Sequence, residues 1–227
     1  MPRLLAIGDI HGCSTALRRL LEIVRICPDD TVVTLGDYMN RGPDTQGVVE
    51  ELMKLGQRTR LITLMGNHEQ MWLRALDSPE AEEEWKACGG DSTLASYGVK
   101  SAREIPLAHY AFFQSCLKYH EEETHFFVHA NADPYAPLDS QVDHTLLWEH
   151  LNFAPAPHVS GKSMVCGHTP QKNGRPLDFG HGVCVDTNVH DGGWLTCLEV
   201  RTRHYWQADQ QGKSRADVLE SDEEEAW

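Results

Sequence analysis

Five short polar segments of this chain carry residue types that can bind metal ions and phosphate groups. Each segment follows a short apolar run. They are Gly8-Asp9-Ile10-His11-Gly12, Gly36-Asp37-Tyr38-Met39-Asn40-Arg41-Gly42, Gly66-Asn67-His68-Glu69, His129-Ala130-Asn131 and Gly167-His168-Thr169. Carboxylate oxygens and neutral imidazole nitrogens suit Mn, Fe or Zn as ligands. A carboxylate shared by two ions is common in hydrolases, so the pattern predicts a two-metal site that hydrolyses phosphoesters.

The apolar runs predict the strands that position these segments. We expect strands over residues 4–7, 31–35, 60–65, 125–128, 163–166, 182–185, 194–200 and 203–207, and helices over 14–26, 44–55 and 70–76. The segment 79–117 is expected to be mostly helical. This order predicts an α/β protein with at least one mixed sheet. The carboxyl ends of the strands, where ligands bind in open α/β sheets, would then bring the five segments together.

At these motifs the chain resembles the phosphoprotein phosphatase family within the calcineurin-like metallophosphoesterases. The first segment matches the motif G-D-x-H-G, the second matches G-D-x-x-D-R-G except at Asn40, and the third matches G-N-H-E. The match covers residues 4–200, and the compact size is similar to the phage lambda and bacterial branch. The resemblance implies two mixed β-sheets in a sandwich flanked by helices.

The resemblance also implies the metal ligands and the reaction. One metal would be held by Asp9, His11 and Asp37, and the second by Asp37, Asn67, His129 and His168. The two divalent ions are expected to be Mn, with Fe or Zn as alternatives. A hydroxide that bridges them would attack phosphorus directly, without a covalent enzyme intermediate.

Further residues are implied to act on the substrate. Arg41 would bind the phosphate oxygens with its planar guanidinium, together with Asn67 and His68. His68 would also protonate the leaving oxygen as a general acid. The catalytic set is therefore His68, Asn40 and Arg41.

Two positions depart from the family pattern. The family usually has aspartate where this chain has Asn40, which can accept a hydrogen bond from His68 but carries no charge. We therefore expect His68 to titrate lower than in relatives and activity to favour good leaving groups. Relatives often carry a phosphate-binding arginine two residues after a tryptophan. Here Trp148 is followed by Glu149 and His150, so His150 either replaces that arginine or lies on the surface.

The other histidines have no metal-like spacing and are expected to be structural or exposed. They are His109, His120, His125, His144, His158, His181, His190 and His204.

Three functions agree with these features. The first is a metal-dependent phosphomonoesterase, similar to serine/threonine protein phosphatases, with phosphotyrosine as a further substrate. The second is a dinucleotide polyphosphate hydrolase of the symmetrical diadenosine tetraphosphatase type. The third, motivated by Asn40 and the missing arginine, is a metal-binding phosphosensor without catalysis. A phosphorylated protein needs an open groove, whereas a nucleotide needs an aromatic or apolar base pocket.

Composition limits the partners and the compartment. The net charge of −14 argues against nucleic acid, whose binding rests on clustered lysine and arginine. No apolar run is long enough for a membrane span or a signal peptide, and seven scattered cysteines favour free thiols in a reducing cytoplasm. We expect a catalytic domain over residues 1–208 and an acidic, disordered tail over 209–227. The oligomeric state is left open.

Overall fold

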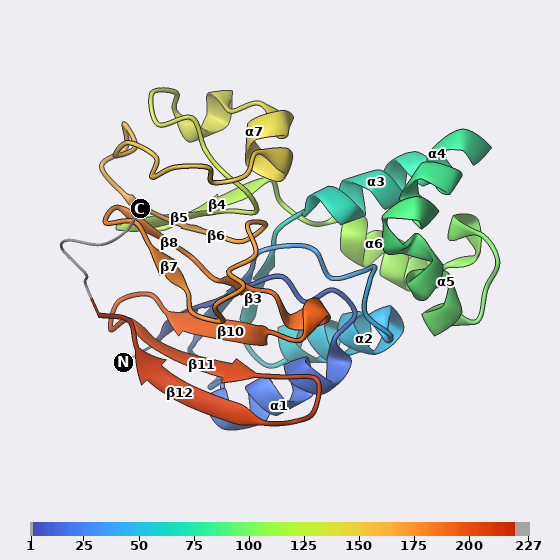
Figure 1. Ribbon diagram of the computed structural model, residues 1–227, viewed down its shortest axis with the longest axis horizontal. Helices are drawn as coiled ribbons and strands as arrows, with labels where there is room; N and C mark the ends of the chain where they lie inside the picture. Colours follow the sequence, from blue (N-terminus) through green and yellow to red (C-terminus); the bar gives the residue numbers. More distant parts are fainter. Residues whose placement is uncertain (1, 221–227) are drawn as a thin grey trace.

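Two β-sheets face one another in the computed structural model, which describes residues 2–220 (Figure 1). The first sheet has the order β12-β11-β10-β1-β2-β3, with β9 beside β10, and the second has the order β4-β5-β6-β8-β7. The strands are β1 Leu4–Ile7, β2 Thr31–Thr34, β3 Arg60–Thr63, β4 Tyr119–Glu121, β5 His125–Val128, β6 Ser163–Cys166, β7 Leu177–Asp178, β8 Gly182–Cys184, β9 Asp186–Thr187, β10 Trp194–Glu199, β11 His204–Ala208 and β12 Ser214–Val218. Strands β1, β2 and β3 are parallel, whereas β10 pairs antiparallel with β1. In the second sheet β5, β6 and β8 are parallel and β4 is antiparallel. The predicted fold of two mixed sheets is confirmed.

Helices flank this sandwich. They are α1 Ser14–Val24, α2 Thr45–Gly56, α3 Asn67–Ala75, α4 Pro79–Trp85, α5 Asp91–Tyr97, α6 Leu107–Gln114 and α7 Asp143–Trp148. In Figure 1, α1 and α2 pack below the first sheet, α3 to α6 form a separate helical lobe to the right, and α7 lies above the second sheet. Asp44 caps α2 as its position predicts, because its side chain accepts a hydrogen bond from the backbone nitrogen of Gly47 at 2.9 Å.

The strand β1 contributes to two apolar clusters, one on each face of the first sheet. Its side chains alternate between the two faces of the sheet. Leu5 and Ile7 pack with α1 and α2, whereas Leu4 and Ala6 pack between the sheets with residues such as Phe127. A third apolar cluster lies on the outer face of the second sheet, beneath α7. All four residues of β1 are buried, as their uniformly apolar sequence requires.

The expected boundary at residue 208 and the disordered tail after it are wrong as far as residue 218. Residues 214–218 form β12, which pairs antiparallel with β11. The guanidinium of Arg215 lies 4.3 Å from the ring of Trp194 and donates to Oε1 of Gln207. These cross-strand contacts, rather than an apolar pattern, order the strand, so hydrophobic periodicity missed it. The remainder of the predicted tail, residues 221–227, lies outside the described residues.

The helix expected at residues 70–76 begins three residues earlier, at Asn67. Asn67 and His68 therefore lie on the first turn of α3 rather than in a loop. The short strands β4, β7 and β9 were not expected, because two or three residues cannot show a periodic pattern.

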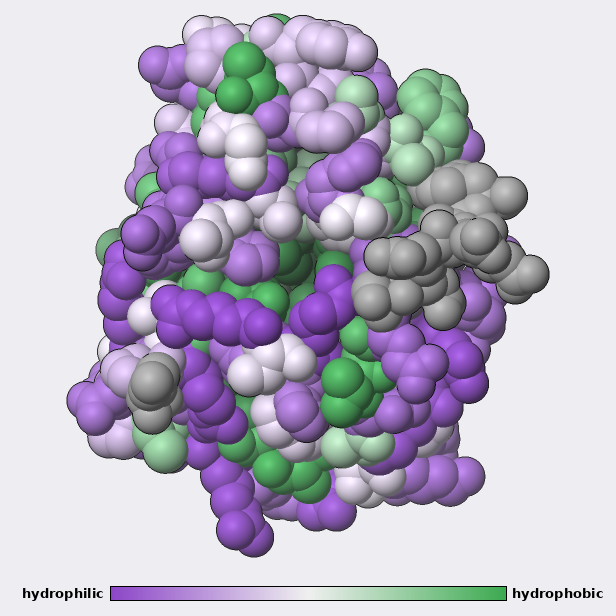
Figure 2. All heavy atoms as spheres, turned by 90° about the vertical axis from the view of Figure 1, so that its left-hand side faces the viewer, coloured by the Kyte–Doolittle hydropathy of each residue, from purple (hydrophilic) through white to green (hydrophobic). Residues whose placement is uncertain are grey.

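The face in Figure 2 is mostly hydrophilic, with hydrophobic side chains in small groups between polar ones. Among the described residues, no helix has the length and apolar character needed to cross a membrane.

Candidate metal centre

The ends of parallel strands in both sheets meet at one cavity. The first sheet supplies Asp9 and His11 after β1, Asp37 after β2, and Asn67 and His68 after β3. The second supplies His129 after β5 and His168 after β6. The cavity has a volume of about 590 Å³, and its lining includes Asp9, Asp37, Arg41, Asn67, His68, His150, His168 and Asp186. The strand ends therefore position the polar segments together, as the sequence predicts.

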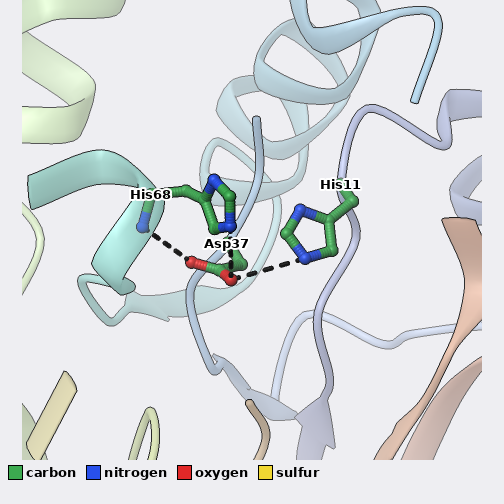
Figure 3. A group of neighbouring side chains, drawn as sticks. All are labelled: His11, Asp37 and His68. Carbon is green, nitrogen blue, oxygen red and sulfur yellow. Dashed lines mark hydrogen bonds and ion pairs between the residues drawn. The ribbon is translucent and has the colours of Figure 1, made fainter. Parts of the chain in front are cut away.

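Asp37 lies between two groups of histidines. Its Oδ2 is 3.4 Å from Nε2 of His11 and 3.9 Å from Nε2 of His68 (Figure 3). Its Oδ1 is 3.5 Å from Nε2 of His129, and His168 completes this second group. The two oxygens of one carboxylate thus face different imidazoles, which is the arrangement that a bridging ligand needs.

In the second group, two imidazole nitrogens that carry lone pairs face one another. Nδ1 of His129 is 2.8 Å from the carbonyl oxygen of Leu35, and Nε2 of His168 is 3.2 Å from that of Trp148. Each of these nitrogens must donate to its carbonyl, so the other ring nitrogen carries a lone pair. These two lone-pair nitrogens are 3.1 Å apart. The amide of Asn67 lies beside them: its oxygen can join them as a metal ligand, and when the amide is turned its nitrogen can donate to both imidazoles. Such a set of acceptors fits a cation.

The protonation states agree with a cation site. Burial, with weaker effects from nearby groups, lowers the pKa of His129 to about 3 and that of His168 to about 2. Burial also lowers the pKa of His11 well below its usual value. The imidazoles are therefore neutral and able to coordinate a metal. Burial raises the pKa values of Asp9 and Asp37, and neighbouring carboxylates reinforce the effect, because their charges lack a positive partner that a divalent ion would supply.

Asp9 is less closely joined to the centre than the resemblance implies. Its carboxylate accepts the backbone N–H of His168 at 3.1 Å, so it connects the two sheets. It does not belong to the tight group of His11, Asp37 and His68. Glycines beside the carboxylates are required sterically, because a Cβ at Gly167 would overlap the carboxylate of Asp9.

The backbone at the centre is held in an unusual conformation. His11, Asp37, Asn40, Arg41 and His168 all have positive φ angles, between 45° and 68°. This region is uncommon for residues other than glycine, and such strain clusters at functional sites.

The buried Glu69 stabilises this loop from α3. Its Oε2 accepts the backbone N–H of Asp37 at 2.8 Å, and its Oε1 accepts that of Tyr38 at 2.9 Å. The same carboxylate accepts the N–H of Gly66 at 3.0 Å. The start of α3 is therefore tied to the end of β2.

Asn40 contacts His68 through its amide nitrogen rather than through its oxygen. Nδ2 of Asn40 is 2.7 Å from Nδ1 of His68, and both side chains are buried. The expectation that Asn40 accepts a hydrogen bond from His68 is therefore wrong, because an amide nitrogen only donates. Burial, together with Arg41 and His168, lowers the pKa of His68 to about 3.

Arg41 and His150, two of the residues considered for phosphate binding, both line the cavity. Nη1 of the exposed Arg41 is 3.1 Å from Nε2 of His11. The exposed ring of His150 stacks on that of His168, with centroids 4.3 Å apart and an interplanar angle of 19°. His150 thus stands at the edge of the centre and not on a remote surface.

Sequence reasoning missed two residues near the centre. His190, expected to be structural or exposed, has its ring 4.8 Å from that of His11, and its buried Nδ1 has no hydrogen-bond partner among the described residues. Asp186 lines the cavity, and burial raises its pKa to about 6. Asp186 follows the apolar run that ends at Val185 and is the first residue of β9, so its place after a predicted strand could have indicated it. No local sequence pattern indicates His190.

Two facing mixed sheets whose strand ends carry paired aspartate and histidine groups define a metal-dependent phosphoesterase. The chain belongs to the calcineurin-like phosphoesterase family, whose profile matches residues 2–195. This membership makes the chain a hydrolase that uses divalent metal ions.

Two curated relatives have different names. The chain is 30% identical to serine/threonine-protein phosphatase 1 of Salmonella typhimurium over 208 residues, which are 86% of this chain and 90% of the relative. It is 45% identical to a symmetrical bis(5'-nucleosyl)-tetraphosphatase of Paracidovorax citrulli over 73 residues, which are 32% of this chain and 25% of that relative. A solved structure of a cold-active protein tyrosine phosphatase has a similar fold, with a TM-score of 0.68 and 18% identity over 95% of this chain and 78% of that one.

Proposed function

We propose that the protein is a phosphomonoesterase that removes phosphate from phosphoserine or phosphothreonine in proteins, with phosphotyrosine as a further substrate. The similarity to serine/threonine-protein phosphatase 1 supports this substrate class, because it extends over 90% of that relative. By contrast, the match to the tetraphosphatase of Paracidovorax citrulli extends over 25% of that relative. Membership of a hydrolase family favours catalysis over a phosphosensor.

The observation that carries the proposed site is the position of Asp37 between two sets of nitrogen ligands. His11 and His129 approach different oxygens of its carboxylate, at 3.4 and 3.5 Å. In this proposal Asp9, His11 and Asp37 hold one divalent ion, and Asp37, Asn67, His129 and His168 hold the other. Bound manganese, iron or zinc would stabilise charge on the phosphoryl oxygens and activate a water molecule.

The remaining side chains orient the substrate. Arg41 presents a planar guanidinium at the cavity, which suits two phosphate oxygens at once. His150 supplies a second, weaker donor beside His168. Asn67 and His68 complete the phosphate site. Nε2 of His68 faces the carboxylate of Asp37, 3.9 Å from its Oδ2, and therefore points into the metal centre. Proton donation from this nitrogen would assist departure of the alcohol.

The test measures turnover of a phosphothreonine peptide and of p-nitrophenyl phosphate by the manganese-loaded protein. We expect turnover of both, and a loss of at least about a hundredfold in Asp37→Asn, because the bridging charge is removed. His144→Asn, at an exposed position outside the cavity, is the matched control and should retain activity. Absence of turnover of both substrates in fully loaded protein would contradict the proposal.

A second candidate is hydrolysis of a dinucleoside polyphosphate. A cleft of about 520 Å³ shares His150 with the metal cavity, and its lining includes Tyr135 and Phe153. These aromatic side chains are 82% and 74% exposed, so they are available to stack on a nucleobase. Comparing kcat/KM for diadenosine tetraphosphate and for the phosphopeptide separates the candidates. A Tyr135→Ala variant should lower only the nucleotide value if the cleft binds a base.

A further inference from the structure

Thr93 contacts Asn40 from a helix that lies outside the metal centre. Its Oγ1 accepts the backbone N–H of Asn40 at 2.9 Å and is 2.9 Å from Oδ1 of the same residue. It is also 3.1 Å from Oγ1 of Thr45. All three residues are fully buried, so their polar groups must find partners inside the protein.

Counting hydrogens limits how these groups can be connected. A hydroxyl has one hydrogen to donate and two acceptor sites. The backbone N–H of Asn40 takes one acceptor site of Thr93. If Thr45 donates to the other, the single hydrogen of Thr93 is directed to Oδ1 of Asn40. The amide nitrogen must then face the other way, toward His68.

The orientation of the amide determines which nitrogen of His68 carries a hydrogen. Nδ2 of Asn40 lies 2.7 Å from Nδ1 of His68 and can only donate. Nδ1 therefore accepts, and the hydrogen of the imidazole is on Nε2. Nε2 is the nitrogen that faces the centre, 3.9 Å from Oδ2 of Asp37.

We propose that Thr93 is a positioning residue for His68: its hydroxyl holds the amide of Asn40 so that the ring presents an N–H group, and not a lone pair, to the substrate phosphate. This inference rests on the proposed function, which gives that N–H group a substrate oxygen to bind. A lone pair at Nε2 would repel the anionic oxygens, whereas an N–H group binds them. Asn40 and the helix α5 thus act together on His68.

The alternative is that Thr93 only attaches α5 to α2. The chain offers a matched control for this reading, because Ser96 lies one turn further along α5. Its Oγ accepts the backbone N–H of Gln46 at 2.9 Å, as Thr93 accepts that of Asn40. Ser96→Ala therefore removes a comparable contact, from α5 to the first turn of α2, without touching Asn40.

The test is ¹⁵N NMR of the zinc-loaded protein with labelled histidine, with the His68 signals assigned from a His68→Gln variant. The parent, Thr93→Ser and Ser96→Ala should have the His68 hydrogen on Nε2. In Thr93→Val the amide is free to turn its oxygen toward the ring, so a measurable fraction of the hydrogen should move to Nδ1. The same variant should raise KM for an aryl phosphate about threefold or more, because part of the protein then presents a lone pair instead of an N–H group to the phosphate oxygens.

Two outcomes overturn the proposal: a hydrogen on Nδ1 in the parent, or an unchanged ring in a folded Thr93→Val protein. If Thr93→Val does not fold, the spectra of the parent and of Asn40→Asp decide the question. The carboxylate of Asp at position 40 accepts from Nδ1, so Asn40→Asp should show a hydrogen on Nδ1 that the parent lacks. The spectra do not depend on turnover, so an inactive protein with the expected ring state would contradict the proposed function alone.

Discussion

The amide at position 40 changes what the neighbouring imidazole can do. An aspartate there would accept a hydrogen bond from Nδ1 of His68 and stabilise its charged form. Asn40 instead donates to Nδ1 at 2.7 Å, and burial already lowers the pKa of His68 to about 3. The ring is thus neutral at physiological pH and can donate a hydrogen bond, but it is a poor source of a proton.

Asn40→Asp should therefore raise activity on substrates with poor leaving groups. We expect kcat for an alkyl phosphate to increase by about tenfold or more, because a charged His68 can protonate the alkoxide. The value for p-nitrophenyl phosphate should change little, since its leaving group needs no proton. Steady-state kinetics on both substrates over a pH series measure this, and an equal change for both would contradict the reasoning.

The exposed ring of His150 stacks on His168 at the edge of the cavity. His150→Ala should raise KM for a phosphate ester about three- to tenfold, corresponding to the loss of one hydrogen bond of about 1 kcal/mol, with kcat less affected. His144→Ala, at an exposed position on α7 outside the cavity, is the control. An unchanged KM would place His150 outside substrate binding.

At the scale of elements, local patterns predicted the strands that carry the site and the residues that follow them. The apolar runs before Asp9, Asp37, His129 and His168 are short and clear, so strand ends could be located. The positive φ angles of Asp37 and Asn40 could not be predicted, because tertiary contacts such as those of Glu69 and Thr93 impose them. The orientation of the Asn40 amide depends on Thr93, which lies 53 residues away in sequence.

Glu69 connects α3 with the metal-binding loop after β2. Glu69→Gln replaces one acceptor oxygen by a donor that would face the backbone N–H groups of Asp37 and Tyr38. We expect the affinity for manganese to fall by about 10- to 100-fold, as for other residues that orient ligands. Isothermal titration measures the affinity. Glu80→Gln, on the neighbouring helix α4, should leave it unchanged.

Asp30, directly before β2, contacts Arg3, which directly precedes β1, so the pair joins the starts of two neighbouring strands. Its carboxylate accepts hydrogen bonds from the backbone nitrogen and Nε of Arg3 and from the backbone nitrogen of Cys27, and the Arg3 bonds help to lower its pKa even though burial opposes them. A lowered folded-state pKa means that this stabilisation is present above the unfolded pKa of about 4 and is lost as pH falls through the folded value.

Asp30→Asn should accordingly lower the free energy of unfolding by about 1–3 kcal/mol at pH 7, and the difference should disappear at lower pH, once Asp30 is protonated in the folded parent. Urea denaturation of the metal-free protein at a series of pH values measures this. A difference that stays constant down to the lowest pH would show that the charge of Asp30 is not responsible.

At the scale of the whole molecule, the candidate ligands come from both sheets. Asp9, His11, Asp37 and Asn67 follow strands of the first sheet, whereas His129 and His168 follow strands of the second. Divalent ions bound there would join the sheets and relieve the mutual repulsion of the buried carboxylates.

Removal of metal should therefore lower the melting temperature. A ligand present at about 100 times its Kd stabilises the folded state by about 2.7 kcal/mol, which is a shift of several degrees for a chain of this size. Calorimetry with manganese and after chelation measures the shift, and Asp37→Asn should abolish most of it. Equal melting temperatures in the parent would mean that the ions do not join the sheets.

The position of β10 has a consequence for synthesis of the chain. Leu5 pairs with Glu199, and β1 is an edge strand until β10 arrives beside it. On the ribosome, the loops that carry Asp9 and His11 are complete long before this partner is translated. The nascent polypeptide is therefore expected to be inactive until nearly all of the chain has been translated. During that time β1 should remain accessible to chaperones.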